Sequence, residues 1–197
     1  MKIAFIGTHG VGKTTLCFEL AACLKRLDLS VDIVKEVARA CPLPINRDTT
    51  IAAQSWILHS QVAREIEVAS RYEAVVCDRS VVDNYAYMVH AAGRRPDLEP
   101  FLRAWMSSYT MLVKVPVIAP PSFDGTRDTS VDFQGAIDRL IDELLDEFGF
   151  PRLALAPRDR DHWIAAVLQR AGLPLHPPQL ELFNQASRRR NSLSGND

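Results

Sequence analysis

Cysteine is scarce in this sequence, and its spacing fits no metal site. Among 197 residues there are four cysteines: Cys17, Cys23, Cys41 and Cys77. No two of them form a Cys-x-x-Cys pair, and no histidine lies at zinc-ligand spacing from them. Cys17, Cys23 and Cys77 fall within apolar segments, so we interpret them as small core residues rather than disulfide partners or ligands. Such usage is typical of a reducing compartment, and we expect a cytoplasmic protein.

Long hydrophobic runs and an excess of one charge are also missing. No apolar stretch reaches the roughly 20 residues that span a membrane, and the N-terminus has one lysine before a strand-like run, unlike a signal peptide. The formal net charge is -1, so the molecule as a whole does not attract nucleic acid or an anionic membrane. We therefore expect neither partner, and any phosphate binding must come from a local site.

What remains is ordinary globular composition, with 47% hydrophobic and 24% charged residues. Short apolar runs predict strands at residues 2–6, 31–34, 74–77, 111–115 and 153–156. Helical periodicity predicts helices at about 13–28, 49–71, 81–92, 97–107, 131–148 and 159–171. This alternation predicts an α/β fold, a three-layer α/β/α sandwich around a mainly parallel five-stranded sheet.

The length suits one domain, which we place at residues 1–171. A loop at about 116–130 is punctuated by prolines and a glycine. From residue 172 the chain carries three prolines, an arginine run at 188–190 and a polar end, so we expect 172–197 to be a loosely ordered tail. We interpret the arginine run as a solvated tail rather than a nucleic-acid patch.

The N-terminal strand is followed by a phosphate-binding pattern. GxxxxGK[ST] is matched in full by Gly7-Thr8-His9-Gly10-Val11-Gly12-Lys13-Thr14. The glycines let the backbone approach phosphates closely with its N–H groups pointing inward, and the helix that follows adds its positive N-terminal end. Lys13 places a cation on the β- and γ-phosphates, and the Thr14 hydroxyl offers a ligand to Mg²⁺. We predict that residues 7–15, through Thr15, bind ATP; His9 occupies a variable position and is assigned no chemistry.

Asp78 ends the apolar strand at 74–77. The carboxyl ends of strands in such a sheet are where ligands bind, and a carboxylate there can hold Mg²⁺ through water. The alternative is that Asp78 only caps the helix that follows. With the phosphate-binding pattern beside it, we predict that Asp78 and Thr14 serve the metal.

Three further segments accompany these motifs: Lys35-Glu36-Val37-Ala38-Arg39, Asp78-Arg79-Ser80 and Asp124-Gly125-Thr126-Arg127. With them, the chain resembles the nucleoside and nucleotide kinase branch of the P-loop NTPases over residues 1 to about 171. It is most similar to the small kinase-like ATPase domains related to nicotinamide riboside kinase, and thymidylate and deoxynucleoside kinases are more distant relatives. The resemblance implies a P-loop NTPase fold in which the loop at 116–130 is a lid.

The resemblance also implies roles around the phosphoryl acceptor. Glu36 would be the general base or the group that orients the acceptor, and Arg39 would bind the acceptor or its phosphate; the alternative is a surface Glu/Arg pair. Arg79 would contact the acceptor or the transferred phosphoryl group, or else form only a structural salt bridge. Asp83 and Asn84 follow and would line the same cleft.

Other implied contacts lie farther along the chain. Arg127 would close over the phosphates from the lid, unless this is an ordinary polar loop. Arg158 and Arg160 follow the last strand, where relatives touch adenine, but exposed arginines fit equally. Gln54 and Gln61 lie seven residues apart on one helix face, and in the relatives an amide on this helix reads the acceptor base.

Two departures from the family patterns leave the acceptor undecided. An acidic residue followed by proline, typical of deoxynucleoside kinases, is here Glu36-Val37, and the triplet ends in Ser80 where thymidylate kinase has tyrosine. Neither departure changes a residue that we predict to bind ATP.

The combined reading is a kinase that uses Mg²⁺ and ATP, with a small nucleoside- or nucleotide-like molecule as acceptor. The alternative is a regulatory module that binds or slowly hydrolyses ATP; the chain offers no second domain to receive its signal and is short for the helical lid domain of oligomeric motor ATPases. A GTPase is less favoured because no Asn-Lys-x-Asp motif is present. The family resemblance also allows a homodimer through the long helices.

Overall fold

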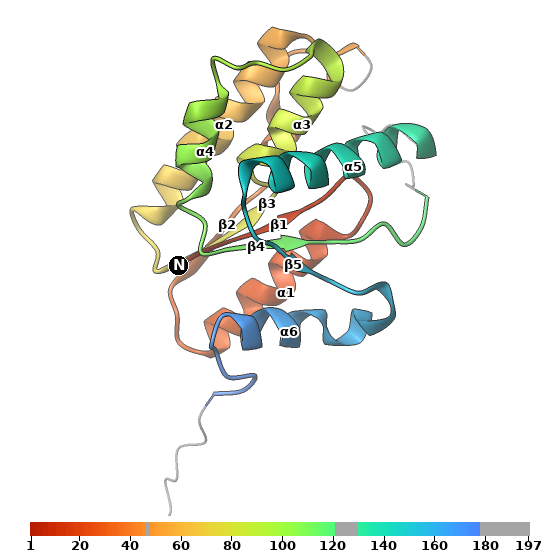
Figure 1. Ribbon diagram of the computed structural model, residues 1–197. Coiled ribbons are helices and arrows are strands. Elements are labelled where there is room, and N and C mark those ends of the chain that lie inside the picture. Colours follow the sequence, from red (N-terminus) through yellow and green to blue (C-terminus); the bar gives the residue numbers. More distant parts are fainter. Residues whose placement is uncertain (46–47, 121–129, 178–197) are drawn as a thin grey trace, which may run out of the picture.

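The computed structural model describes residues 1–45, 48–120 and 130–177. Its centre is one parallel sheet in the order β2-β3-β1-β4-β5 (Figure 1). The strands are β1 (Lys2–Ile6), β2 (Val31–Val34), β3 (Ala74–Asp78), β4 (Met111–Lys114) and β5 (Leu153–Ala154). The helices are α1 (Lys13–Arg26), α2 (Ile51–Ala69), α3 (Val81–Ala92), α4 (Glu99–Met106), α5 (Val131–Phe148) and α6 (Trp163–Arg170), with 3₁₀ turns η1 (Val37–Ala40) and η3 (Pro157–His162). The predicted five-stranded α/β sandwich is confirmed.

Helices cover both faces of the sheet, α1 and α6 on one and α2, α3, α4 and α5 on the other (Figure 1). The alternation of β1 shows how the sequence builds both layers. Ala4 and Ile6 pack into the cluster beneath α3 and α5, while Ile3 and Phe5 pack against α1 and α6. Because successive strand residues point to opposite faces, a strand buried on both sides must be apolar throughout.

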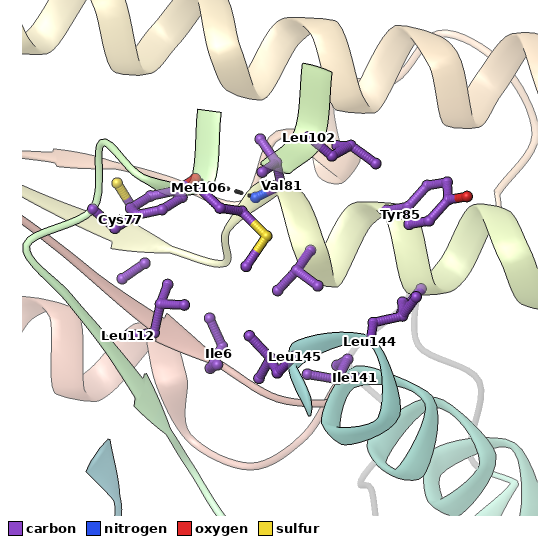
Figure 2. Close-up of a cluster of buried hydrophobic side chains, with 14 of the residues drawn as sticks. Ile6, Cys77, Val81, Tyr85, Leu102, Met106, Leu112, Ile141, Leu144 and Leu145 are labelled. Atoms are coloured by element: carbon purple, nitrogen blue, oxygen red, sulfur yellow. Dashed lines mark hydrogen bonds between the residues drawn. The ribbon is translucent and has the colours of Figure 1, made fainter. Parts of the chain in front are cut away.

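The larger cluster is centred on α3 (Figure 2). Tyr85 and Met88 of this helix are fully buried, together with Ile141 of α5 and Leu102 of α4. Truncating such a side chain to alanine typically costs about 2–5 kcal/mol. This packing fixes α3, whose first turn carries several of the site residues described below.

The cysteines behave as small packing residues at two of the three predicted positions. Cys17 and Cys77 are buried, and burial raises the pKa of each thiol well above its ordinary value. Cys23 of α1 is only half-buried and packs at the edge of the cluster that contains Ile3 and Phe5. All four thiols are free.

The C-terminal part of the domain differs in detail from the prediction. The last strand was expected at 153–156, but it pairs with β4 only at Leu153 and Ala154. The closing helix was expected from Asp159, whereas the 3₁₀ turn η3 occupies Pro157–His162 and α6 begins at Trp163. Asp159 has φ -106° and ψ 26°, which interrupts the helical path.

Two sequence predictions fall largely outside the described residues. These are the lid, because residues 121–129 with Arg127 are not described, and the tail from 178 onward. None of the helices in the described part of the chain is long and apolar enough to cross a membrane.

Candidate active site

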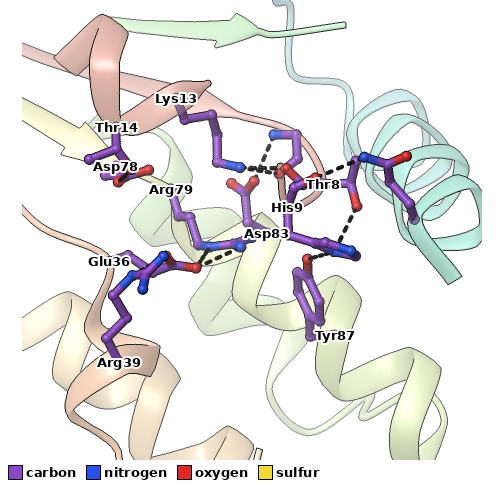
Figure 3. Close-up of polar contacts among 12 residues, drawn as sticks. Thr8, His9, Lys13, Thr14, Glu36, Arg39, Asp78, Arg79, Asp83 and Tyr87 are labelled. Carbon is purple, nitrogen blue, oxygen red and sulfur yellow. Dashed lines mark hydrogen bonds and ion pairs between the residues drawn. The ribbon is translucent and has the colours of Figure 1, made fainter. Parts of the chain in front are cut away.

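Three strand ends bring the predicted motifs together. The chain leaves β1 into the phosphate-binding loop, leaves β3 at Asp78, and leaves β2 toward Glu36. Since β3 lies between β1 and β2 and all three are parallel, these ends meet at one edge of the sheet. Figure 3 shows the resulting group of polar side chains.

The backbone of the loop requires glycine at its first position. Gly7 has φ +138°, and a Cβ there would lie 2.8 Å from the backbone oxygen of Val115. Gly12 has φ +90° and is the N-cap of α1, which has no side-chain cap. The first amide groups of α1 are therefore available to an anion, as a phosphate site requires.

Lys13 lies folded against the loop. Its Nζ donates hydrogen bonds to the carbonyl oxygens of Gly7 at 2.9 Å and Thr8 at 2.5 Å. Burial, and next the positive charge of Arg79, lower the pKa of Lys13 to about 8. The ammonium group therefore keeps its charge at neutral pH and lies at the loop, where a phosphate would take over from the carbonyl oxygens.

Thr14 and Asp78, the two predicted metal ligands, are hydrogen-bonded to each other. The Thr14 hydroxyl donates to Oδ2 of Asp78 at 2.5 Å. The alternative role of Asp78 is contradicted by the structure, because the N-cap of α3 is Ser80. Within the described residues no three His, Cys, Asp or Glu side chains cluster closely enough to hold a metal by themselves. A carboxylate and a hydroxyl do fit Mg²⁺, which takes few protein ligands and completes its shell with water and phosphate oxygens.

Glu36 binds both predicted arginines. Nε and Nη2 of Arg79 lie 2.8 and 2.7 Å from Glu36 Oε1, and Nε of Arg39 lies 3.0 Å from Oε2. Arg79 is buried and its guanidinium lies 4.9 Å from the Tyr87 ring centroid, whereas the Arg39 side chain is 45% exposed. The charge of Arg79 is the main reason that the pKa of Glu36 falls to about 2, against the opposing effect of burial. The residues predicted to contact the acceptor are therefore also ion-pair partners of one another, so the two roles considered for them are not exclusive.

Asp83 links the phosphate-binding loop to the turn between β3 and α3, a role that the sequence did not reveal. Its Oδ1 accepts the Gly7 N–H at 2.8 Å, and its Oδ2 accepts both the N–H and the hydroxyl of Ser80 at 2.8 Å. The second set is a capping box at the start of α3, a pattern visible as Ser-x-x-Asp. Burial raises the pKa of this carboxyl group.

A second unforeseen contact reaches the loop from α5. Gln134 is fully buried, and its Nε2 donates to the backbone oxygen of His9 at 3.0 Å. The neighbouring Phe133 ring lies 5.6 Å from the His9 ring and 6.0 Å from that of Tyr87. The helix that follows the predicted lid is therefore in direct contact with the phosphate-binding loop.

A cavity opens beside this cluster. Its walls combine the polar residues Glu36, Arg39, Gln54, Arg79 and Asn84 with His9, Ala38, Ile45, Ile57 and Tyr87. Among the lining residues, Arg79 Nη1 and Asn84 Nδ2 are buried donors without a hydrogen-bond partner. Its mixed walls and spare donors are those of a site for a small polar organic molecule.

Another cavity lies between the start of α1 and the segment that runs from η3 into α6. It is lined by Val11, Gly12, Thr15, Leu16, Glu19, Arg160, Asp161, Trp163 and Ile164. Arg158 does not line it; its side chain is 88% exposed and faces Asp159 at 3.8 Å. Of the two arginines that the sequence suggested for this place, Arg160 lines the cavity and Arg158 does not.

Comparisons with known proteins agree with this geometry. A family model described as an AAA domain matches residues 2–162. The structure of deoxyadenosine kinase from M.mycoides with bound dATP has a TM-score of 0.62 at 17% identity, covering 87% of this chain and 99% of that one. NadR protein in complex with NR has a TM-score of 0.70 at 19% identity, covering 91% of this chain and 53% of that one. No curated protein matches significantly. At these identities the two structures establish a shared kinase-like fold.

Proposed function

The chain belongs to the AAA-domain family, and from its site we propose that it is an Mg²⁺-dependent kinase that moves the γ-phosphoryl group of ATP to a small nucleoside- or nucleotide-like acceptor. One observation carries this proposal: the cavity bounded by Glu36 and Arg79 lies directly beside the phosphate-binding loop. Simple hydrolysis needs room for water only, whereas transfer to a second molecule needs such a pocket.

The loop and its neighbours provide the ATP side of the site. Residues 7–15 hold the phosphates through backbone N–H groups, and Lys13 adds a positive charge to them. Thr14 and Asp78 would hold Mg²⁺, which supplies neutralisation of phosphate charge when bound. The cavity that contains Thr15 and Arg160 is the candidate site for the adenine base.

Glu36 is better suited to orienting the acceptor than to removing its proton. A carboxylate with a pKa near 2 is a weak base at neutral pH. It is nonetheless charged and lines the acceptor cavity, so it can receive a hydrogen bond from an acceptor hydroxyl. Phosphoryl transfer depends mainly on positioning and charge stabilisation, for which a strong base is not required.

Arg79 supplies positive charge between the acceptor cavity and the loop. Glu36 occupies its Nε and Nη2 atoms, and the buried Nη1 remains available to an oxygen of the acceptor or of the transferred group. Arg39 is placed to contact the outer part of the acceptor, and Gln54 and Asn84 line the same cavity. The bound molecules in the similar structures, dATP and NR, support the nucleoside-like class.

The direct test is ATP consumption with and without small acceptors. We expect a nucleoside-like acceptor to raise consumption at least tenfold over the rate with water alone, and Lys13→Ala to abolish both rates. The regulatory alternative predicts a slow rate that no acceptor changes and that Glu36→Gln leaves as it was. That result, obtained with a broad acceptor pool, would overturn the proposal.

A further inference from the structure

Arg79 has an unusual backbone for a residue with a large side chain. Its φ is 91°, and among the described non-glycine residues only Asp28 shares a positive φ. Aspartate tolerates this region through its short polar side chain, but arginine does not. Such a conformation persists when the surroundings hold it in place, and strained residues of this kind gather at functional sites.

Two buried side chains hold the turn at residues 79–81, which joins β3 to α3. Gln61 of α2 donates from Nε2 to the backbone oxygen of Arg79 at 3.2 Å. The Tyr109 hydroxyl accepts the backbone N–H of Val81 at 3.2 Å. Together they fix the peptide groups on both sides of Ser80, and the Arg79 N–H donates to the Phe5 carbonyl oxygen at 3.1 Å, so the backbone is held before and after Arg79.

A buried carboxylate sets the direction of both bonds. Glu65 is 1% exposed, and its Oε1 accepts hydrogen bonds from Gln61 Nε2 at 2.9 Å and from the Tyr109 hydroxyl at 2.6 Å. Because an ionised carboxylate only accepts, it draws the Gln61 NH₂ group and the Tyr109 proton toward itself. The second Gln61 proton then faces the Arg79 carbonyl, and the Tyr109 lone pairs face Val81.

The opposite oxygen of Glu65 is held separately. Lys2 Nζ lies 2.7 Å and Trp105 Nε1 lies 2.8 Å from Oε2. These two donors stabilise the buried charge from the other oxygen, and in the described part of the chain neither side chain donates a hydrogen bond to residues 79–81. Glu65 therefore accepts two pairs of hydrogen bonds. The donors to Oε1, Gln61 and Tyr109, also bind the backbone at residues 79–81, and the donors to Oε2 serve as a comparison.

The amide of Gln61 also carries an unmet acceptor. Its Oε1 is buried and has no hydrogen-bond partner among the residues that the structure describes. A buried polar atom left unpaired is costly, so the position is not optimised for stability alone. The arrangement favours placing the NH₂ group between Glu65 and the Arg79 carbonyl.

We propose that Gln61 and Tyr109 are positioning residues for Arg79, which hold its backbone so that the guanidinium rests on Glu36 beside the acceptor cavity. The role of Arg79 in transfer rests on the proposed function; the control of its placement does not. A glutamine with this task differs from one that reads the acceptor, because Gln61 is absent from the cavity walls that include Gln54.

The test compares variants that each remove one hydrogen bond to Glu65. Gln61→Met and Tyr109→Phe touch the turn, and Trp105→Phe is the matched control. We expect acceptor-dependent kcat to fall at least tenfold in the first two, with KM for ATP within twofold of the unmodified protein. Trp105→Phe should stay within twofold on both measures, although its unfolding midpoint falls. Equal loss of kcat in all three variants overturns the proposal.

A double variant separates positioning from general destabilisation. If Gln61 acts through Arg79, Gln61→Met should reduce kcat by less than twofold when added to Arg79→Lys. Full additivity of the two effects overturns the proposal.

A readout independent of turnover distinguishes this proposal from the proposed function. Arg79 Nε–H, buried on Glu36, should give a sharp, slowly exchanging NMR resonance that Gln61→Met broadens or shifts and Trp105→Phe retains. If no acceptor is phosphorylated, the proposed function fails while this resonance still decides the positioning. An unchanged resonance in both Gln61→Met and Tyr109→Phe contradicts the positioning role.

Discussion

Replacing Glu36 with glutamine should reveal how strongly the site depends on its central ion pair. Glu36→Gln keeps the size of the side chain but removes the charge that faces Arg79 and Arg39. The Arg79 guanidinium would then remain buried without its anionic partner. Breaking a buried ion pair from one side typically costs about 3–5 kcal/mol.

The shift in acidity gives a second estimate of this cost. The pKa of Glu36 falls from 4.5 to about 2, chiefly because of the Arg79 charge. At about 1.4 kcal/mol for each tenfold change in acidity, the ionised form is favoured in the folded protein by about 3 kcal/mol. The side chain is only 15% exposed, so screening by water reduces this little. Both estimates indicate a loss of about 3 kcal/mol at pH 7.

The sign of the pH dependence follows from the lowered pKa. A carboxyl group that is more acidic in the folded state contributes its full stabilisation above its unfolded value of 4.5 and loses it as the pH falls toward 2. Urea unfolding of the two proteins should therefore differ by about 3 kcal/mol at pH 7 and converge between pH 4.5 and 2.

Glu67→Gln is the control for Glu36→Gln. Glu67→Gln removes an exposed carboxylate that pairs with Arg64, and should change stability little at any pH. A Glu36→Gln protein as stable as the unmodified one at pH 7 would refute the reasoning. So would a gap between the two that stays constant down to pH 2.

Three further predictions concern the ATP side. Since the pKa of Lys13 is about 8, calorimetric affinity for Mg²⁺-ATP should fall by up to tenfold per pH unit above pH 8; constant affinity to pH 10 would contradict this. Gly7→Ala should lose ATP binding and about 1–3 kcal/mol of stability, because its Cβ would meet Val115 at 2.8 Å, whereas Gly135→Ala in α5 should be tolerated in both assays. Asp78→Asn should raise the Mg²⁺ concentration for half-maximal turnover at least tenfold, and an unchanged requirement would remove Asp78 from the metal site.

The fold and the phosphate site could be predicted because their signals are local. The pattern from Gly7 to Thr14 occupies consecutive residues, and each strand is a continuous apolar run. Once the strands are known to be parallel, the ends of β1, β2 and β3 must meet at one edge. The sequence does not give the strand order, and it is the order β2-β3-β1 in the structure that brings Glu36 beside Asp78 and Arg79.

What could not be predicted depends on contacts between distant residues. Asp83 and Gly7 are 76 positions apart, and Gln134 and His9 are 125 apart. No periodicity records such pairs, since they follow from how α3 and α5 pack over the sheet. Which of Arg158 and Arg160 lines the second cavity also could not be predicted, because both lie in the 3₁₀ turn η3, where a regular helix was expected to begin at Asp159.

The most direct test of the central claim is mass spectrometry of the products formed from γ-labelled Mg²⁺-ATP and a pool of acceptors. The pool should contain nucleosides, nucleoside monophosphates, nicotinamide riboside and other small alcohols. The account predicts a labelled phosphorylated acceptor that is absent with Lys13→Ala. ADP with labelled free phosphate as the sole products would contradict it and would withdraw the acceptor roles of Glu36 and Arg39.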